Sequence, residues 1–178
     1  GSAEETQIDE IFKPNKLVFT EILRLTKSMR DLAKKILPDS KINEGSPENT
    51  NGDNTPLVVE FDSETSEFSW IADNAVQRAA PGNPSCILFT HHSDIKKFLY
   101  QIYKSENITP AGPFEDVNIN DHNSKLDYRQ VNGYFKRHKL PYRYLGNSFG
   151  ELDESDKQPI VFIMTYHSSK GLDFDTVY

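Results

Sequence analysis

The stretch Ile160-Val-Phe-Ile-Met164, followed directly by the polar run Thr165-Tyr-His-Ser-Ser-Lys-Gly171, decides the fold of this chain. Five consecutive apolar residues bounded by polar ones are typical of a strand buried on both faces of a parallel sheet. Ligands of open parallel sheets bind where the strands end, at their carboxyl edge. The strand is therefore expected to place residues 165–171 at the edge where function usually resides.

Patterns typical of strands and helices alternate along the rest of the sequence. Cys86-Ile-Leu-Phe-Thr90 is a second short apolar run and predicts a central parallel strand. Alternation of this kind predicts an α/β fold, a mostly parallel sheet with helices on both faces. Further strands are expected at 18–25, 57–61, 142–145 and 174–178, and helices after the capping residue Thr26, across 68–79, after the capping residue Ser93, and over about 124–138.

Composition is that of one soluble domain with a core of its own. The chain has 178 residues, of which 36% are hydrophobic and 26% charged. It contains no apolar run of membrane-spanning length and no N-terminal secretion signal, so the cytoplasm is the expected compartment and no membrane partner is expected. The single cysteine, Cys86, excludes an internal disulfide and a zinc site built from cysteines.

Domain boundaries are also expected from the sequence. Gly1-Ser2 is typical of a cloning remnant, and residues 3–178 are expected to form one domain. Mobile loops are expected near 38–56 and 146–158, which are rich in Gly, Ser, Asn and Asp. The sequence ends on an expected strand without a polar tail, which favours a fragment of a longer parent chain.

The net charge of −7 argues against a free-standing nucleic-acid binder held mainly by neutralised phosphates. A local contact strip remains open at Tyr134-Phe-Lys-Arg-His-Lys-Leu-Pro-Tyr-Arg143, which carries four Lys and Arg residues and no acid. A solvated helix end, where basic residues favour the last turn, is the preferred interpretation of this strip.

The run after the 160–164 strand combines side chains that suit an anionic ligand. Hydroxyls such as those of Ser168 and Ser169 position phosphates, Lys170 would neutralise them, and Gly171 permits close backbone approach. The alternative is a capped turn whose hydroxyls bond only to local amides. No metal site is expected, because His167 has no His, Cys or carboxylate partner at ligand spacing. A serine hydrolase is not supported, because the chain has no Gly-x-Ser-x-Gly elbow.

The run Thr165-x-His-x-x-Lys-Gly-Leu-Asp-Phe174 resembles the fifth motif of UvrD/Rep-like superfamily 1 helicases, usually Thr-x-His-x-x-Lys-Gly-Leu-Glu-Phe. The resemblance implies a three-layer RecA-like domain of the P-loop NTPase type, the second motor lobe of an ATP-dependent DNA helicase or translocase. Lysine before the glycine favours the branch that moves 3′ to 5′. The resemblance further implies single-stranded DNA contacts by Thr165, His167, Ser168 and Lys170, and coupling to the nucleotide by Gly171 and Asp173.

A second, weaker resemblance lies near the start. Residues 23–33 are similar to the fourth motif of the family, which implies that Arg24 reaches the ATP γ-phosphate from the second lobe. A guanidinium suits this role because it stays charged and forks onto phosphate oxygens. The alternative for Arg24 is an ordinary surface ion pair.

The sequence departs from the family in ways that limit what the chain does alone. It lacks its own phosphate-binding loop and an acidic Mg²⁺ motif. The resemblance therefore implies that ATP and Mg²⁺ are held mainly by the first RecA-like lobe of the parent chain, and no cofactor is expected in the fragment. The sixth motif is absent, Leu23 replaces a tyrosine, and Asp173 replaces a glutamate. The alternative function is a non-catalytic interaction or docking module of helicase descent.

Overall fold

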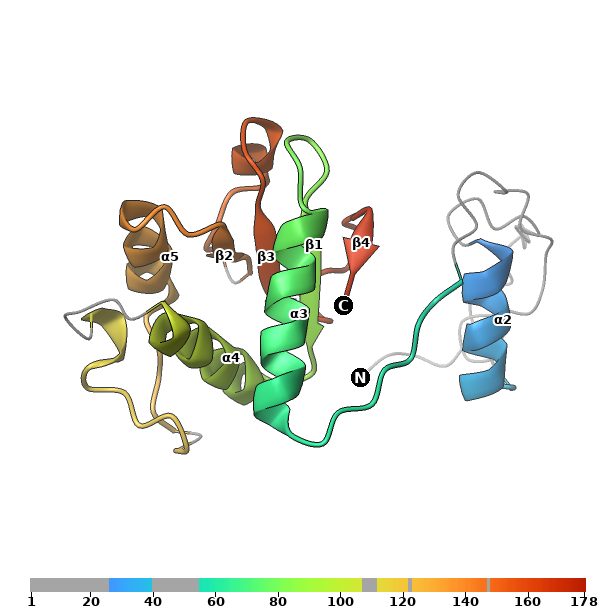
Figure 1. Ribbon diagram of the computed structural model, residues 1–178, viewed down its shortest axis with the longest axis horizontal. Coiled ribbons are helices and arrows are strands. Elements are labelled where there is room, and N and C mark those ends of the chain that lie inside the picture. Colours follow the sequence, from blue (N-terminus) through green and yellow to red (C-terminus); the bar gives the residue numbers. More distant parts are fainter. Residues whose placement is uncertain (1–25, 40–54, 107–111, 122, 147) are drawn as a thin grey trace, which may run out of the picture. The chain divides into compact units, whose positions relative to one another are not determined.

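The computed structural model describes residues 26–39, 55–106, 112–121, 123–146 and 148–178 (Figure 1). The chain divides into two compact units, Gly1–Val59 and Glu60–Tyr178. Arg24, the strand expected over 18–25 and residues 40–54 of the first expected loop lie outside the described residues. The single domain expected over 3–178 stays a prediction.

Helix α2, Lys27–Ile36, is the described helix of the first unit. Thr26 caps it as expected, because its side chain accepts a hydrogen bond from the Met29 amide at 3.3 Å. The helix ends at Ile36, and its C-cap Leu37 directly precedes Pro38.

The second unit is built on a four-stranded sheet. Its strands are β1 (Ser85–Phe89), β2 (Tyr142–Tyr144), β3 (Val161–Thr165) and β4 (Thr176–Val177), in the spatial order β2-β3-β1-β4. Every pairing is parallel, and β1 and β3 align over their whole length. The α/β fold with a parallel sheet is confirmed. The arrangement is compatible with a three-layer RecA-like lobe without being specific to one.

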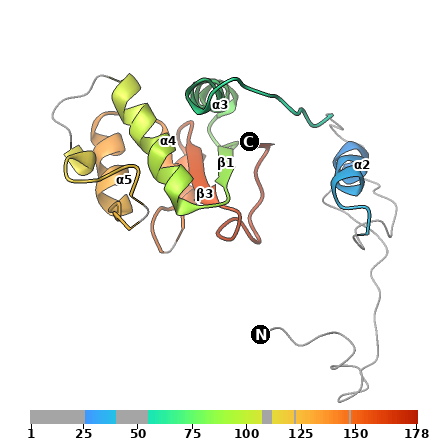
Figure 2. The same ribbon diagram turned by 90° about the horizontal axis from the view of Figure 1, so that it is seen from below.

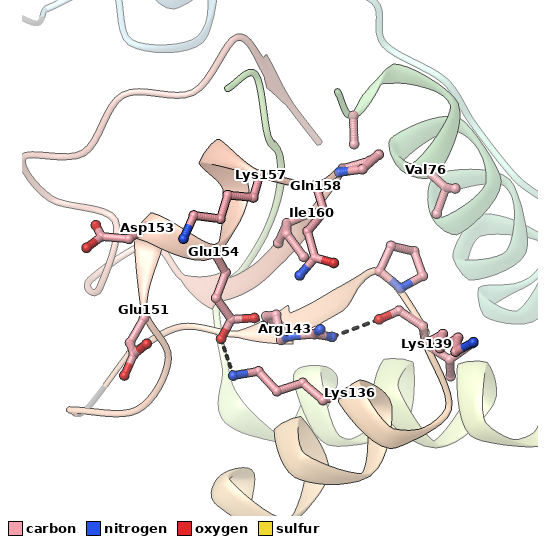
Figure 3. A pocket seen from close by; sticks show the side chains of 14 residues that line it. Val76, Lys136, Lys139, Arg143, Glu151, Asp153, Glu154, Lys157, Gln158 and Ile160 are labelled. Atoms are coloured by element: carbon pink, nitrogen blue, oxygen red, sulfur yellow. Dashed lines mark hydrogen bonds and ion pairs between the residues drawn. The ribbon is translucent and has the colours of Figure 1, made fainter. Parts of the chain in front are cut away.

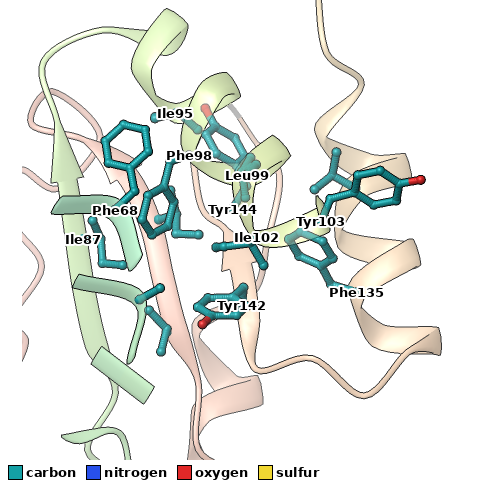
Figure 4. Packing of buried hydrophobic residues seen from close by; sticks show 14 of the residues in the cluster. Phe68, Ile87, Ile95, Phe98, Leu99, Ile102, Tyr103, Phe135, Tyr142 and Tyr144 are labelled. Carbon is teal, nitrogen blue, oxygen red and sulfur yellow. The ribbon is translucent and has the colours of Figure 1, made fainter. Parts of the chain in front are cut away.

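Three helices, α3 (Glu64–Arg78), α4 (His92–Ser105) and α5 (Tyr128–Arg137), belong to this unit, together with the 3-10 turns η2 (Gly112–Phe114) and η3 (Leu152–Asp156). Helices α3 and α4 lie on the same side of β1 and β3 (Figure 2). Aromatic and branched side chains of all three helices meet one face of the sheet in a single buried cluster (Figure 4). Its members include Phe68, Phe98, Leu99, Phe135, Ile87, Tyr144 and Ile163.

Alternate residues of the central strands point to the opposite face. Cys86, Phe162 and Met164 form a second buried cluster there, against which Leu172 and Phe174 pack. Both faces of β3 are therefore covered, which explains why its sequence is continuously apolar. The C-terminal segment is fixed to the sheet through this second cluster.

The structure corrects several expected elements. The strand predicted over 57–61 is not formed, and Leu57 and Val58 are 82% and 79% exposed. A β-favouring sequence becomes a strand only when a neighbouring strand pairs with it, and none of the described strands does. Helix α4 is capped by His91, without a side-chain bond, and not by Ser93. Helix α5 starts after Asp127, and the last strand is limited to Thr176–Val177.

Candidate functional site

Strand β3 ends in a tight turn whose base is fixed by two hydroxyls. Thr165 is 6% exposed, and its Oγ1 lies 3.1 Å from Oγ of Ser168. The Ser168 amide also donates to Thr165 Oγ1, and the amides of Ser168 and Ser169 both donate to the Thr165 carbonyl. The hydroxyls of Thr165 and Ser168 therefore form the local hydrogen bonds that a capped turn predicts.

The crest of the same turn is exposed. The side chains of His167 and Lys170 face solvent, and neither has a hydrogen bond or an ion pair within the part of the chain that the structure describes. Gly171 follows with a φ of +86°, a conformation that strains residues with a side chain. Asp173 is exposed as well. The turn thus presents a cation and an imidazole on a fixed base.

A second loop lies against this turn. A Cβ atom added at Gly146, which follows β2, would lie 2.8 Å from Oγ of Ser168 and 3.1 Å from Oη of Tyr144. A side chain at this position would have to displace these hydroxyls, and the φ of +149° at Gly146 also favours glycine. The backbones of Gly146 and Phe149 exchange two hydrogen bonds of 3.0 and 2.9 Å, which hold this second loop in shape.

Aromatic side chains line the same carboxyl edge of the sheet. The Tyr128 ring stacks on Tyr144 at 3.7 Å, and its hydroxyl lies 3.2 Å from Nδ1 of His92. Burial, with a further contribution from Tyr144, raises the pKa of Tyr128 well above its usual range, so the phenol stays neutral. These residues were not predicted as part of the site, because their proximity depends on the sheet order β2-β3-β1.

The structure thus separates the expected site residues by exposure. Thr165 is buried and Ser168 half-buried within the turn, whereas His167, Lys170, Gly171 and Asp173 are exposed. Within the described residues, no group of three or more His, Cys, Asp and Glu side chains is placed to hold a metal ion. Among the described helices, none combines the length and apolar character needed to cross a bilayer.

Lys96 is a buried cation that the sequence reasoning missed. It is 3% exposed, and its Nζ donates to the carbonyls of Asn118, Asp121 and Ser124 at 3.1, 2.6 and 3.0 Å. A buried ammonium needs such partners to offset the loss of water. Lys96 therefore fixes the irregular segment that leads into α5.

A hollow of 860 Å³ lies at the opposite, amino edge of the sheet (Figure 3). Three of its charged residues are paired with one another: Glu154 accepts a 2.9 Å hydrogen bond from Nε of Arg143 and forms an ion pair with Lys136. Desolvation would raise the pKa of Glu154, but Lys136 and Arg143 outweigh it and hold that pKa below its usual value. These ion pairs attach η3 to α5 and β2, which gives the paired residues of the hollow a structural role.

Comparison with known proteins adds no relative. No family model matches the chain, and searches of curated proteins and of solved structures also give no match. The resemblance to helicases therefore rests on the residues of the sequence motifs alone.

Proposed function

We propose that this chain is the second motor lobe of an ATP-dependent DNA helicase or translocase of the UvrD/Rep-like kind, moving 3′ to 5′. One observation carries the proposal. The ten-residue motif 165–174 begins at the last residue of β3, a parallel strand buried on both faces, and presents an exposed imidazole and ammonium at the carboxyl edge of the sheet.

Within this proposal, the turn after β3 contacts the backbone of single-stranded DNA. Lys170 neutralises a phosphate and His167 donates or accepts a hydrogen bond beside it. Thr165 and Ser168 hold the shape of the turn through the hydrogen bonds between them. Gly171 and Asp173 couple the DNA contact to the nucleotide, as the resemblance implies. Both residues lie between the turn and the C-terminal segment that packs against the sheet.

ATP and Mg²⁺ belong to the interface with the first RecA-like lobe. In the proposal that lobe supplies the phosphate-binding loop, and Arg24 of this chain stabilises the charge of the γ-phosphate across the cleft. Movement on DNA follows from closing and opening of that cleft as ATP is hydrolysed. The 178-residue chain by itself is expected to hydrolyse no ATP.

Binding of a fluorescent single strand tests the DNA-contacting role at low salt. Lys170→Gln should weaken the binding measured by anisotropy, and Lys157→Gln should not, because Lys157 is an equally exposed lysine at the amino edge. Equal losses in both variants would show only a general effect of net charge. Binding by this single, acidic lobe is expected to be weak, and absence of any binding by a protein that contains both lobes would favour the docking-module alternative.

Turnover of ATP tests the second role. In a protein that contains both lobes, Arg24→Ala should reduce ATP hydrolysis strongly while DNA affinity without nucleotide stays close to normal. Normal turnover in that variant would remove Arg24 from the proposed machinery.

A further inference from the structure

Two arginines of α5, Arg129 and Arg137, lie on aromatic rings. The Cζ atom of Arg129 lies 5.8 Å from the centre of the Phe149 ring, and that of Arg137 lies 5.9 Å from the Tyr134 ring. Neither guanidinium is in an ion pair with a carboxylate of the described residues. Ring contact orients an arginine and leaves its N–H groups available to another ligand.

Both arginines line one hollow of 480 Å³ between η2 and α5. The other residues of its wall are Gly112, Pro113, Gln130 and Gly133, so the wall carries two positive charges and no negative one. The middle of the wall is open at Gly133, since a Cβ there would meet only the guanidinium of Arg137, at 3.7 Å. An uncompensated basic hollow contrasts with the net charge of −7 of the chain.

The hollow begins near the loop that lies against the turn after β3 and extends along α5 to Arg137, beside Lys136 of the amino-edge hollow. Ser168 touches Gly146, the backbone of Gly146 is bonded to that of Phe149, and the Phe149 ring supports Arg129. Arg129 lies in the first turn of α5 and Arg137 is its last residue. A row of contacts therefore leads from the turn onto the outer face of α5.

We propose that this outer face of α5, with Arg129 and Arg137, binds phosphates of the same DNA strand after it leaves the turn at 165–171. The inference rests on the proposed function. The two arginines are eight positions apart on the helix, which corresponds to about 12 Å along its axis. One phosphate does not span that distance, whereas a polynucleotide offers successive phosphates, so the spacing favours nucleic acid over a singly phosphorylated peptide.

The salt dependence of DNA binding tests this assignment. Each phosphate neutralised on a single strand contributes about 0.7 to the slope of log affinity against log salt. The double variant Arg129→Gln with Arg137→Gln should lower that slope by about 1.4 and weaken binding several-fold. Arg78→Gln is the matched control, because Arg78 is an exposed arginine at the end of α3 and should leave the slope within about 0.7 of the parent value.

Arginine side-chain NMR signals of the full chain separate the possible outcomes. Addition of a long deoxythymidine strand should shift the Nε–Hε signals of Arg129 and Arg137 together with the amides of 165–171. Shifts confined to 165–171 would overturn this inference and leave the proposed function standing. Shifts of the two arginines without any at 165–171 would contradict both. Arginine shifts produced only by a phosphorylated peptide would replace DNA by a protein partner.

Discussion

Oγ of Ser168 lies 3.1 Å from Oγ1 of Thr165, and the Ser168 amide donates to the same threonine oxygen. The two residues close the turn between the buried strand β3 and the exposed crest at His167 and Lys170. Because the bonds lie within the turn, they set the shape in which any ligand would meet it.

Removal of the Thr165 hydroxyl should loosen this turn. Thr165→Ala should lower the free energy of unfolding by about 0.5–1.5 kcal/mol, since one buried hydrogen-bonding group is lost. Urea denaturation measures the change. Thr165→Ser keeps the hydroxyl and should retain most of the stability, so an equal loss in the serine variant would assign the effect to the missing methyl group.

Lys96 and its neighbour Lys97 provide a matched pair on α4. Lys96→Met should cost about 1–3 kcal/mol of unfolding free energy, because three carbonyls lose a buried ammonium. Lys97→Met should cost about 1 kcal/mol or less, since Lys97 forms only a surface ion pair with Glu64. Similar effects in thermal or urea unfolding would contradict the role assigned to Lys96.

Glu154 should make stability depend on pH in the acid range. Because its folded-state pKa lies below the unfolded one, its stabilisation is present above the unfolded value and is lost as the pH falls through the folded value. The wild-type protein should therefore be more stable than Glu154→Gln at neutral pH. That difference should shrink below about pH 4 in urea unfolding.

An exposed acid offers the comparison for this experiment. Glu151→Gln removes a carboxylate from the same segment at an exposed position, so its effect should be small at every pH. A stability difference for Glu154→Gln that persists unchanged into acid would exclude the ion pairs with Arg143 and Lys136 as its cause.

Cys86 should resist thiol reagents while the protein is folded. It is fully buried in β1, and burial raises the pKa of its thiol to about 12, so almost no reactive thiolate forms. Labelling should proceed at the rate of unfolding and become fast in denaturant. Rapid labelling of the native chain would show that the cluster around Phe162 and Met164 opens locally.

The two central strands could be predicted from the sequence, because each is marked by a run of consecutive apolar residues. The apolar runs at 86–90 and 160–164 needed no knowledge of their neighbours to be assigned as buried strands. Leu57–Phe61 has a comparable composition and is not a strand, because pairing depends on a partner far away in the sequence. Thr26 was correctly predicted as a helix N-cap. The prediction of Ser93 as an N-cap was wrong, because its hydroxyl donates to Asp94 and not to the helix amides.

Only part of the candidate site could be predicted from the sequence. Residues 165–174 are contiguous, so the motif itself revealed them. Gly146, Tyr128 and Arg129 come from other segments and reach the edge only through the strand order. Lys96 did leave a signal, since it falls on the stripe shared with Leu99 and Tyr103 on α4, where a cation needs a buried partner.

Amide chemical shifts of the folded chain, recorded while a deoxythymidine oligonucleotide is added at low salt, test the central claim most directly. The account predicts that the amides of Thr165 to Gly171 shift progressively, and that added salt reverses the shifts. A saturating titration that leaves those seven amides unmoved, or that moves only residues of the amino edge around Glu154, would contradict it.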